Sequence, residues 1–303
     1  MNPPPSTLFT AAPEWQWLIV LYFFLGGIAG GAYFLAVLID LFGEVADRPL
    51  ARLGYLVAFP LTVVCGLLLV VDLRRPARFW HMMLQSETLR PMFKAWSPMS
   101  LGSWALLLFG GLALLSFLAA LADDGRGRWP RLAVLRPPGA LGTLVALAGG
   151  LLGFFVAGYT GVLLSATNRP IWADTSVLGL VFLVSGASTA AAALALLGRR
   201  RAAASRAGLT ALERFDSVML VLELVALIAL VVSLGGMARA WLGVWGALLL
   251  IGVVGLGIIV PLVLYRRSLR TGGLSGAGAA AAALVLVGGF LLRVVIILSS
   301  ESI

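Results

Sequence analysis

Eight apolar runs, each long enough to cross a bilayer, decide which folds are open to this sequence. A membrane-spanning helix needs about 20 predominantly apolar residues. Apolar residues surround the whole circumference of each run and glycines recur within them, as in helices that pack closely in lipid. Because only 12% of the residues are charged, against about 25% in soluble domains, the sequence predicts an all-α integral membrane protein. The predicted spans are residues 15–42, 52–72, 97–121, 139–165, 174–197, 211–235, 241–265 and 276–298.

The positive charges are shared unequally between the two sides of the predicted membrane. Fourteen Lys and Arg residues lie in the connectors after the first, third, fifth and seventh spans, and seven lie on the opposite side. The positive-inside rule makes the richer side cytoplasmic, so both termini are expected on the periplasmic side. These loop arginines account for the net charge of +9, and we expect contact with membrane lipid and no nucleic-acid partner.

The sequence has too few thiol and imidazole groups for common redox centres. It contains one cysteine, Cys65, and one histidine, His81. One thiol cannot ligate an iron–sulfur cluster, and one imidazole cannot supply a bis-histidine haem or a histidine-rich metal site. The sequence therefore predicts no haem, no iron–sulfur cluster and no metal in this protein. Electron chemistry here would need an organic ligand or centres on a partner.

The connector 72–104 carries more charge and more aromatic residues than a plain connector needs. It holds five of the seven outer positive charges, against the general charge bias, and eight of the nine tryptophans lie near the outer face. Ordinary aromatic belts occupy both membrane interfaces. We therefore expect this outer surface to bind a ligand or a protein partner. RRPARFWHMML (74–84) is expected to begin a short interfacial helix.

Polar groups from four spans are expected at one depth just below the outer interface. Tyr22 and Tyr159 lie seven and six residues from the outer ends of their spans, which places both hydroxyls roughly 9–10 Å deep. Asp72 ends the second span at the same face, and Ser97, Ser100 and Ser103 begin the third. Tyrosine hydroxyls and a carboxylate can hydrogen-bond and exchange protons with a ring carbonyl.

This arrangement suits a lipid-soluble quinone, whose head group needs two hydrogen-bonding ends and a proton route to water. The alternative is that the tyrosines are interfacial anchors and that Asp72 pairs with Arg75. His81 could relay protons or be a surface residue. The candidate catalytic residues are Tyr159, Asp72, Tyr22 and His81, and the candidate ligand-binding residues are Arg75, Arg78, Ser97, Trp104, Asn168 and Arg169.

Two ionisable residues lie deeper in the predicted spans. Glu223 is near the middle of the sixth span, and Arg293 is about three-quarters of the way out along the eighth. Intramembrane ionisable residues mark candidate functional sites. Here they form either a structural salt bridge or part of a proton or ion pathway. Asp40 and Asp216 lie nearer the inner side, but they do not by themselves establish a continuous channel.

The outer-face motifs divide the predicted spans into two groups of four. The motifs described above all lie on the first four spans or directly after them. We therefore expect an N-terminal four-helix bundle of residues 1–171 that holds the quinone site. A C-terminal four-helix bundle of residues 172–303 is expected to follow it.

Five motifs, in order along the sequence, resemble those of a known membrane-protein family. They are YFFLGGIAGG (22–31), DLRRPARFW (72–80), SPMSLGSW (97–104), GYTGVLLSATNRPIW (158–172) and GGFLLRVVI (288–296). The sequence is similar to the NrfD/PsrC family, the membrane subunits of polysulfide reductase and related molybdoenzyme complexes. The resemblance implies two four-helix bundles, a quinone pocket near the outer face of the first bundle, and no haem.

The resemblance also carries residue roles onto matching positions. Tyr159 looks like the family's quinone-site tyrosine in helix 4, whereas Tyr22 stands where some relatives use histidine and Ile19 where a polar residue occurs. Asp72, Arg75 and Arg78 match the motif at the exit of helix 2. Asn168 and Arg169 match the NRP turn.

The leading hypothesis is a multi-pass subunit of the bacterial inner membrane that oxidises quinol or reduces quinone. Menaquinone or ubiquinone would bind among the first four helices, with proton release or uptake near the outer face. The expected partners are a periplasmic ferredoxin-like iron–sulfur subunit and a molybdopterin catalytic subunit that carries out the substrate chemistry. The alternatives are a proton- or ion-translocating module that uses Glu223 and Arg293, a solute transporter, and a passive anchor.

Overall fold

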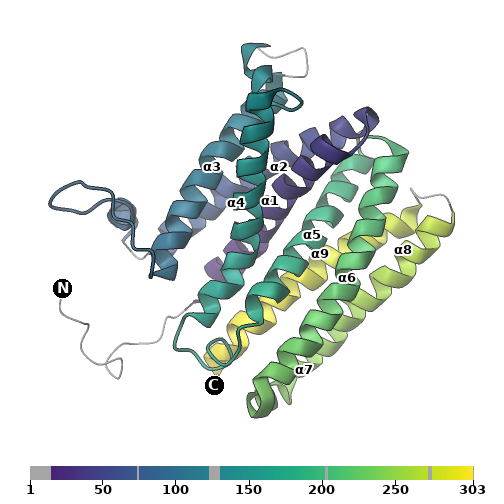
Figure 1. The fold of residues 1–303 in the computed structure, drawn as a ribbon. Coiled ribbons are helices and arrows are strands. Elements are labelled where there is room, and N and C mark those ends of the chain that lie inside the picture. The colour runs from purple at the N-terminus through teal and green to yellow at the C-terminus, as the bar shows by residue number, and fades with distance from the viewer. Residues whose placement is uncertain (1–14, 74, 123–129, 202–203, 272–274, 303) are drawn as a thin grey trace.

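The computed structural model describes residues 15–73, 75–122, 130–201, 204–271 and 275–302. Within these ranges every regular element is helical, and eight helices are long and apolar enough to cross a membrane (Figure 1). The α-helices are α1 (Trp17–Phe42), α2 (Arg48–Asp72), α3 (Pro98–Ala122), α4 (Ala140–Ser165), α5 (Leu178–Arg199), α6 (Arg206–Leu234), the four-residue α7 (Val244–Ala247), α8 (Val260–Arg270) and α9 (Gly276–Ser299). Between α7 and α8 lies the π-helix η6 (Leu248–Ile259). The short 3-10 helices are η2 (Val45–Asp47), η3 (Pro76–Met82), η4 (Pro130–Leu135), η5 (Gly235–Trp241) and η7 (Ser300–Ser302).

Each predicted span is matched by a helix, but the bounds differ by several residues. The fifth helix begins at Leu178 rather than at the predicted residue 174, whereas others begin earlier than predicted. The second helix begins at Arg48, before the predicted residue 52, with Pro49 in its first turn, a position where proline's missing N–H is harmless. The sixth begins at Arg206, before residue 211, because the Ser205 side chain accepts a hydrogen bond from the Gly208 N–H at 2.8 Å and caps the helix. Hydropathy alone does not predict helix N-termini that lie at polar residues.

The seventh span is built from α7, η6 and α8 in succession and differs from a plain α-helix. Its middle twelve residues are a π-helix, in which the Val260 N–H donates to the Gly255 carbonyl. The span ends at Arg270 rather than at the predicted residue 265. In this widened stretch Gly257 packs directly against Gly288 of α9. The backbone stays hydrogen-bonded within its own helix, as the membrane requires.

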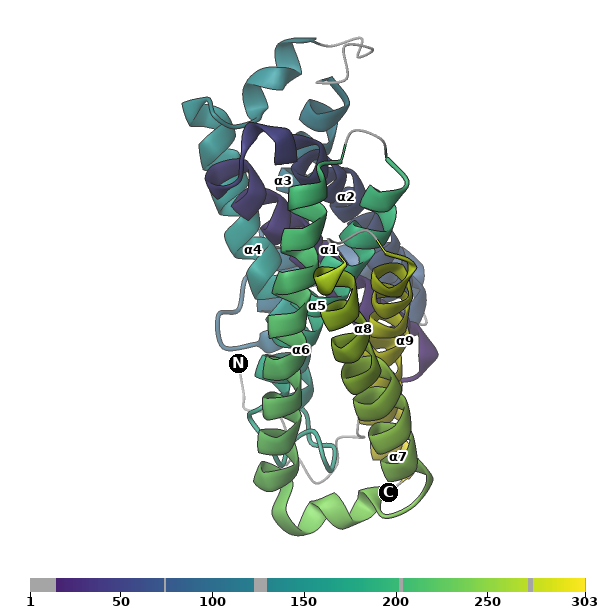
Figure 2. The ribbon, with the colours of Figure 1, turned by 90° about the vertical axis from the view of Figure 1, so that its right-hand side faces the viewer.

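Two helices, α1 and α5, form the centre of the molecule. In their apolar windows 72% of the residues are buried, against 28% in the window that contains α2. Helix α1 packs against α2, α4, α5 and α9, and α5 also contacts α4, α6 and α9 (Figures 1 and 2). A Cβ on Gly30 would collide with the Gly153 carbonyl of α4. The close helix approach expected from GGIAGG is therefore present.

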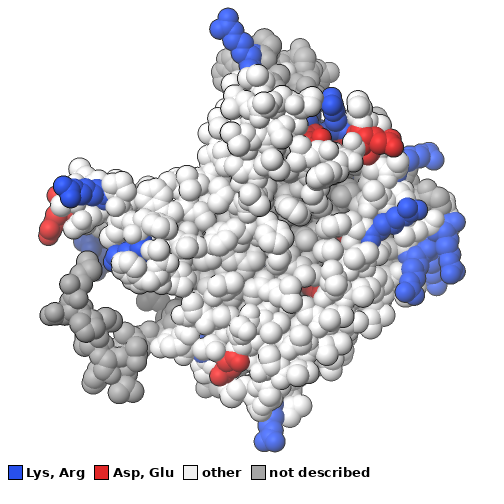
Figure 3. Space-filling model, in the orientation of Figure 1, with Lys and Arg blue, Asp and Glu red and all other residues white. Residues whose placement is uncertain are grey.

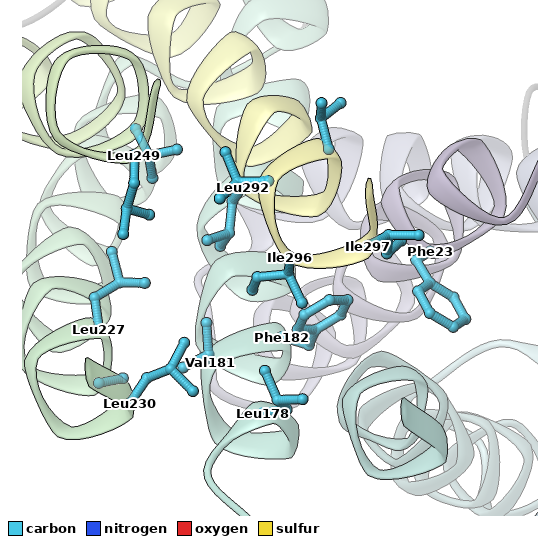
Figure 4. Close-up of a cluster of buried hydrophobic side chains, with 14 of the residues drawn as sticks. Phe23, Leu178, Val181, Phe182, Leu227, Leu230, Leu249, Leu292, Ile296 and Ile297 are labelled. Carbon is cyan, nitrogen blue, oxygen red and sulfur yellow. The ribbon is translucent and has the colours of Figure 1, made fainter. Parts of the chain in front are cut away.

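The largest buried apolar cluster joins α1, α5, α6 and α9. Phe23 of α1 and Phe182 of α5 meet edge to face with ring centroids 5.8 Å apart, and they lie beside Ile296 and Ile297 of α9 (Figure 4). The predicted division at residues 171 and 172 stays a prediction. Lys and Arg side chains gather near the helix ends and leave a broad uncharged surface between them (Figure 3), as expected for a surface that faces lipid.

Candidate functional site

A cavity of about 560 Å³ lies among α1, α2, α3 and α4 and the connector that follows α2. Its volume is typical of small-molecule sites, which span about 300–1,000 Å³. The wall is mostly apolar, and its polar side chains are Tyr22, Thr62, Asp72, Ser103 and Tyr159. Three of the four candidate catalytic residues, from three different helices, therefore line one cavity.

Tyr159 is fixed between α4 and the beginning of α3. Its hydroxyl donates a hydrogen bond to the carbonyl of Pro98, and its ring stacks on Phe155 with centroids 5.3 Å apart. A Cβ on Gly102 would collide with the tyrosine ring. The glycine in the third helix therefore creates the space that lets Tyr159 reach the cavity.

Tyr22 forms the wall opposite, on α1. It is buried, and its main-chain oxygen accepts a contact from the Cys65 Sγ at 3.7 Å. No described residue forms a hydrogen bond with its hydroxyl, which therefore has capacity for a ligand. Ile19 lies one turn nearer the N-terminal end of α1 and also lines the cavity. We call this end of the cavity outer, after the side that the charge pattern predicts to be periplasmic. A phenol donor above apolar walls fits the head group of a quinone.

Asp72 and the following connector form the outer end of the cavity. Asp72 is the last residue of α2, is half-buried and lines the cavity. The interfacial helix expected at 74–84 is the 3-10 helix η3, in which the Arg78 N–H donates to the Arg75 carbonyl at 3.0 Å. Phe79 and Met82 of this segment line the cavity. The connector thus covers the outer end of the cavity.

The charged candidates of this connector lie outside the cavity wall. Arg75 and Arg78 are exposed. His81 is half-buried, its ring stands edge-on to Trp80 with centroids 3.9 Å apart, and Ser86 Oγ lies 3.5 Å from its Nδ1. The two residues after His81 line the cavity, so the imidazole is next to the cavity wall. The roles of these three residues stay predictions.

Ser97 bonds within the beginning of α3, and Trp104 joins α3 to the connector. Ser97 Oγ accepts from the Ser100 N–H at 3.4 Å, and the Trp104 Nε1–H donates to the Met92 carbonyl at 3.0 Å. Neither lines the cavity, whereas Ser103 does and donates to the Met99 carbonyl at 2.8 Å. Ser97 and Trp104 therefore hold the beginning of α3 in place beside the cavity and do not form part of its wall.

The NRP turn docks against the end of α9. Asn168 is exposed, and the Arg169 Nη1–H donates to the Ser300 carbonyl at 3.4 Å. Trp172 is fully buried and its Nε1–H donates to the Ile296 carbonyl at 2.8 Å. Trp172 also stacks on Trp15, a cavity residue, with centroids 5.6 Å apart. The turn therefore supports the cavity wall through a tryptophan pair.

Arg293 and Glu223 lie deep between the central helices. Arg293 is fully buried and donates from Nη1 to Ser185 Oγ at 2.5 Å and to the Gly289 carbonyl at 2.8 Å. Its guanidinium also lies 5.1 Å from the centroid of the Phe182 ring. Glu223 is buried and interacts electrostatically with Arg293 and Ser185. The two ionisable groups are therefore brought together around one serine.

A second buried acid, Asp216, lies further inward on α6, the helix that carries Glu223. Ser188 Oγ donates to Asp216 Oδ1 at 2.5 Å, and the Tyr265 hydroxyl donates to Oδ2 at 2.7 Å. Ser185 and Ser188 are one turn apart on α5. We call Ser185, Ser188, Asp216, Glu223, Tyr265 and Arg293 the α6 polar cluster.

Several wall residues were not predicted from the sequence. Met83, Met99 and Gly102 belong to the outer part of the cavity, and Gly110 and Gly111 to its inner part. The sequence feature that could have indicated this part of the wall is the pair of glycines in the middle of an apolar span. Glycine destabilises a helix interior, so its presence there suggests that the space beside the helix is used.

Comparison with known proteins agrees with this architecture. The family model described as polysulphide reductase, NrfD, matches residues 9–303. Protein NrfD of Escherichia coli (strain K12) is 31% identical over 313 residues, which cover 95% of this protein and 95% of the relative. The C chain of polysulfide reductase from Wolinella succinogenes is 30% identical over 279 residues, which cover 82% of each. The NrfD homolog of Haemophilus influenzae is 26% identical over 278 residues, which cover 86% of this protein and 85% of the relative.

The family match covers nearly the whole sequence, and two relatives reach 30% identity over most of their length. The eight apolar helices make it a multi-pass membrane protein. The chain belongs to the polysulphide reductase NrfD family.

Proposed function

We propose that this protein is the quinone-reactive membrane subunit of a respiratory oxidoreductase complex. The observation that carries the proposal is the placement of Tyr22, Asp72 and Tyr159, from three helices, on one largely apolar cavity. The similarity to the C chain of polysulfide reductase supports a role within a multi-subunit enzyme. We place the protein in the bacterial inner membrane with both termini on the periplasmic side.

The protein's residues would serve a menaquinone or ubiquinone in distinct ways. A bound quinone exchanges two electrons and two protons at its ring oxygens. The Tyr22 hydroxyl would donate a hydrogen bond to one ring oxygen. The Tyr159 hydroxyl, whose proton is directed to the Pro98 carbonyl, would accept a hydrogen bond from a quinol hydroxyl at the other ring oxygen. The Asp72 carboxylate, at the outer end, would accept or return a proton and pass it toward the periplasm, with His81 as the next group. The apolar walls exclude water from the ring.

The outer connector would carry the partner contacts. Its exposed arginines, Arg75 and Arg78, lie beside the cavity's outer end, so a docked partner would be close to the ring. We propose a periplasmic ferredoxin-like iron–sulfur subunit in this position and a molybdopterin catalytic subunit beyond it. With one cysteine and one histidine in the sequence, electron transfer beyond the quinone is assigned to the partner.

Quinol-dependent reduction of the partner's clusters in the intact complex tests this function. Asp72→Asn and Tyr159→Phe should each lower the rate at least about tenfold, the effect of losing one hydrogen bond to a buried polar group. Glu44→Gln, at an exposed position, and Tyr33→Phe are controls on the inner side of the protein and should leave the rate unchanged. Intact rates in both test variants would show that the proposed site is wrong, as would a purified complex without extractable quinone, which a passive anchor predicts.

The α6 polar cluster favours a second candidate function, proton translocation. Asp216 and Glu223 are buried on one helix, seven residues and about 10 Å apart, and serines, a tyrosine and Arg293 connect them to three neighbouring helices. Buried hydrogen-bonded networks of this kind occur in proton relays. The solute-transporter alternative has no comparable observation in its favour.

Acidification measured in proteoliposomes separates the two functions. Glu223→Gln and Asp216→Asn should lower the number of protons moved per electron while quinol oxidation continues. Glu44→Gln replaces an exposed carboxylate near the inner end of α1 and serves as the control. An unchanged proton-to-electron ratio in both test variants rules out the translocating role of the cluster.

A further inference from the structure

The cavity is much longer than a quinone ring. Its wall extends along α2 from Asp72 to Phe59 and along α3 from Met99 to Leu114. At the rise of an α-helix these stretches cover about 20 Å and about 22 Å, roughly two-thirds of the hydrocarbon thickness of a bilayer. A ring at Tyr22 and Tyr159 fills only the outer part.

The two parts of the cavity differ in polarity. Tyr22, Asp72 and Tyr159 belong to the outer part. The inner part is lined by Phe59, Val63, Leu107, Gly111 and Leu114, and Gly66 lies where it joins the outer part. We call these six residues the α2/α3 groove. Thr62 is the polar side chain nearby, and its hydroxyl donates to the Ala58 carbonyl of its own helix at 2.8 Å. The cavity as a whole is polar at one end and apolar along the rest.

The α2/α3 groove opens toward lipid. Val63, Leu107 and Leu114 keep 44%, 56% and 37% of their surface exposed, on the side of the helices that faces the bilayer. A Cβ added at Gly66 or at Gly111 would meet nothing within 4 Å. These glycines therefore leave space that no neighbouring side chain uses.

We propose that the α2/α3 groove holds the isoprenoid tail of the quinone and admits the ring laterally from the bilayer. This inference rests on the proposed quinone function. The argument for a tail is continuity, because the groove leads without a break into the part of the cavity that contains Tyr22 and Tyr159. A phospholipid is a poorer occupant, because its phosphate would meet the Asp72 carboxylate at the polar end. The groove thus favours a molecule that has an uncharged head-group ring and a long apolar tail.

Side chains that fill the groove test the proposal in the intact complex. Gly111→Leu and Gly66→Leu add bulk where a Cβ meets open space, so the fold should be retained. In proteoliposomes the ratio of KM for a long-tailed menaquinol to KM for tail-less menadiol should rise about tenfold or more, the size of an overpacking penalty. Gly276→Leu makes the same change at an open, exposed position of α9, and the ratio should not change.

The outcomes separate the groove from the ring site. If Tyr159→Phe slows both substrates while the two groove variants leave the KM ratio at its original value, the ring site stands and the groove proposal is overturned. If Tyr159→Phe slows neither substrate, the proposed function itself is wrong. Recovery of phospholipid instead of quinone, together with an unchanged KM ratio, would assign the groove to an acyl tail and overturn the proposal.

Discussion

Tyr159 of α4 donates a hydrogen bond to the carbonyl oxygen of Pro98, the first residue of α3. The contact joins two helices at the outer end of the cavity and fixes the direction of the phenol. Gly102, one turn further along α3, provides the space for the ring. The position of the candidate quinone-binding tyrosine therefore depends on a backbone oxygen and on a missing side chain.

Gly102→Ala should displace Tyr159 without unfolding the protein. The new methyl group would collide with the tyrosine ring, and overpacking of this kind costs about 1–3 kcal/mol. We expect a lower rate of quinol oxidation and a raised KM, measured by steady-state kinetics of the intact complex. Gly158→Ala is the control, because its new methyl group would meet its neighbours at an ordinary 3.5 Å. Equal kinetics in the two variants would contradict this role of Gly102.

Trp172→Phe should weaken the outer wall indirectly. The substitution removes the hydrogen bond from Nε1 to the Ile296 carbonyl, a loss of about 1 kcal/mol, and changes the surface on which Trp15 stacks. We expect a lower unfolding temperature and a modest rise in KM for quinol. Trp96→Phe is the comparison, since Trp96 is 80% exposed. A Trp172 variant as stable as the Trp96 variant would show that this tryptophan pair does not support the wall.

Arg293→Gln should be more destabilising than the double variant Arg293→Gln with Glu223→Gln. Removing one member of a buried charged pair leaves the other uncompensated and costs about 3–5 kcal/mol. Removing both relieves that penalty, so the effects should not add. The midpoint temperature of thermal unfolding of the purified complex measures the loss of stability in the single and double variants. Additive losses would show that Glu223 and Arg293 are energetically independent.

Gly30→Ala should destabilise the contact between α1 and α4. Its methyl group would collide with the Gly153 carbonyl, whereas the same change at Gly66 meets nothing within 4 Å. We expect the first variant to lose about 1–3 kcal/mol of stability and the second to lose none, measured by thermal unfolding. Loss of stability in both would point to backbone effects rather than to helix approach.

Helix number and the depth of the two tyrosines were predictable from the sequence for simple reasons. Runs of about 20 apolar residues can satisfy their backbone in lipid only as helices. Residue counts from the helix ends placed Tyr22 and Tyr159 at one level, and both line one cavity. The GGIAGG spacing likewise predicted a close neighbour for α1.

The remaining features depend on which helix faces meet, and one sequence does not contain that information. The bond from Tyr159 to Pro98 requires the register of α4 against α3. The bonds to Asp216 come from Ser188 on α5 and Tyr265 on α8, which are 28 and 49 residues away in the sequence. The π-helical stretch of the seventh span is at least as apolar as the α-helical spans, so hydropathy does not distinguish it from an α-helix. Only packing distinguishes these cases.

Photolabelling with an azido-quinone tests the central claim, that this cavity is the quinone site, most directly. The intact complex in native lipid would be illuminated with the probe and its labelled peptides sequenced. We predict label within residues 15–23, 59–107 and 155–163, which contain most of the cavity wall, and loss of the label when excess unmodified quinol is present. Competable label confined to α6, α8 and α9, with none in those three ranges, would contradict the claim.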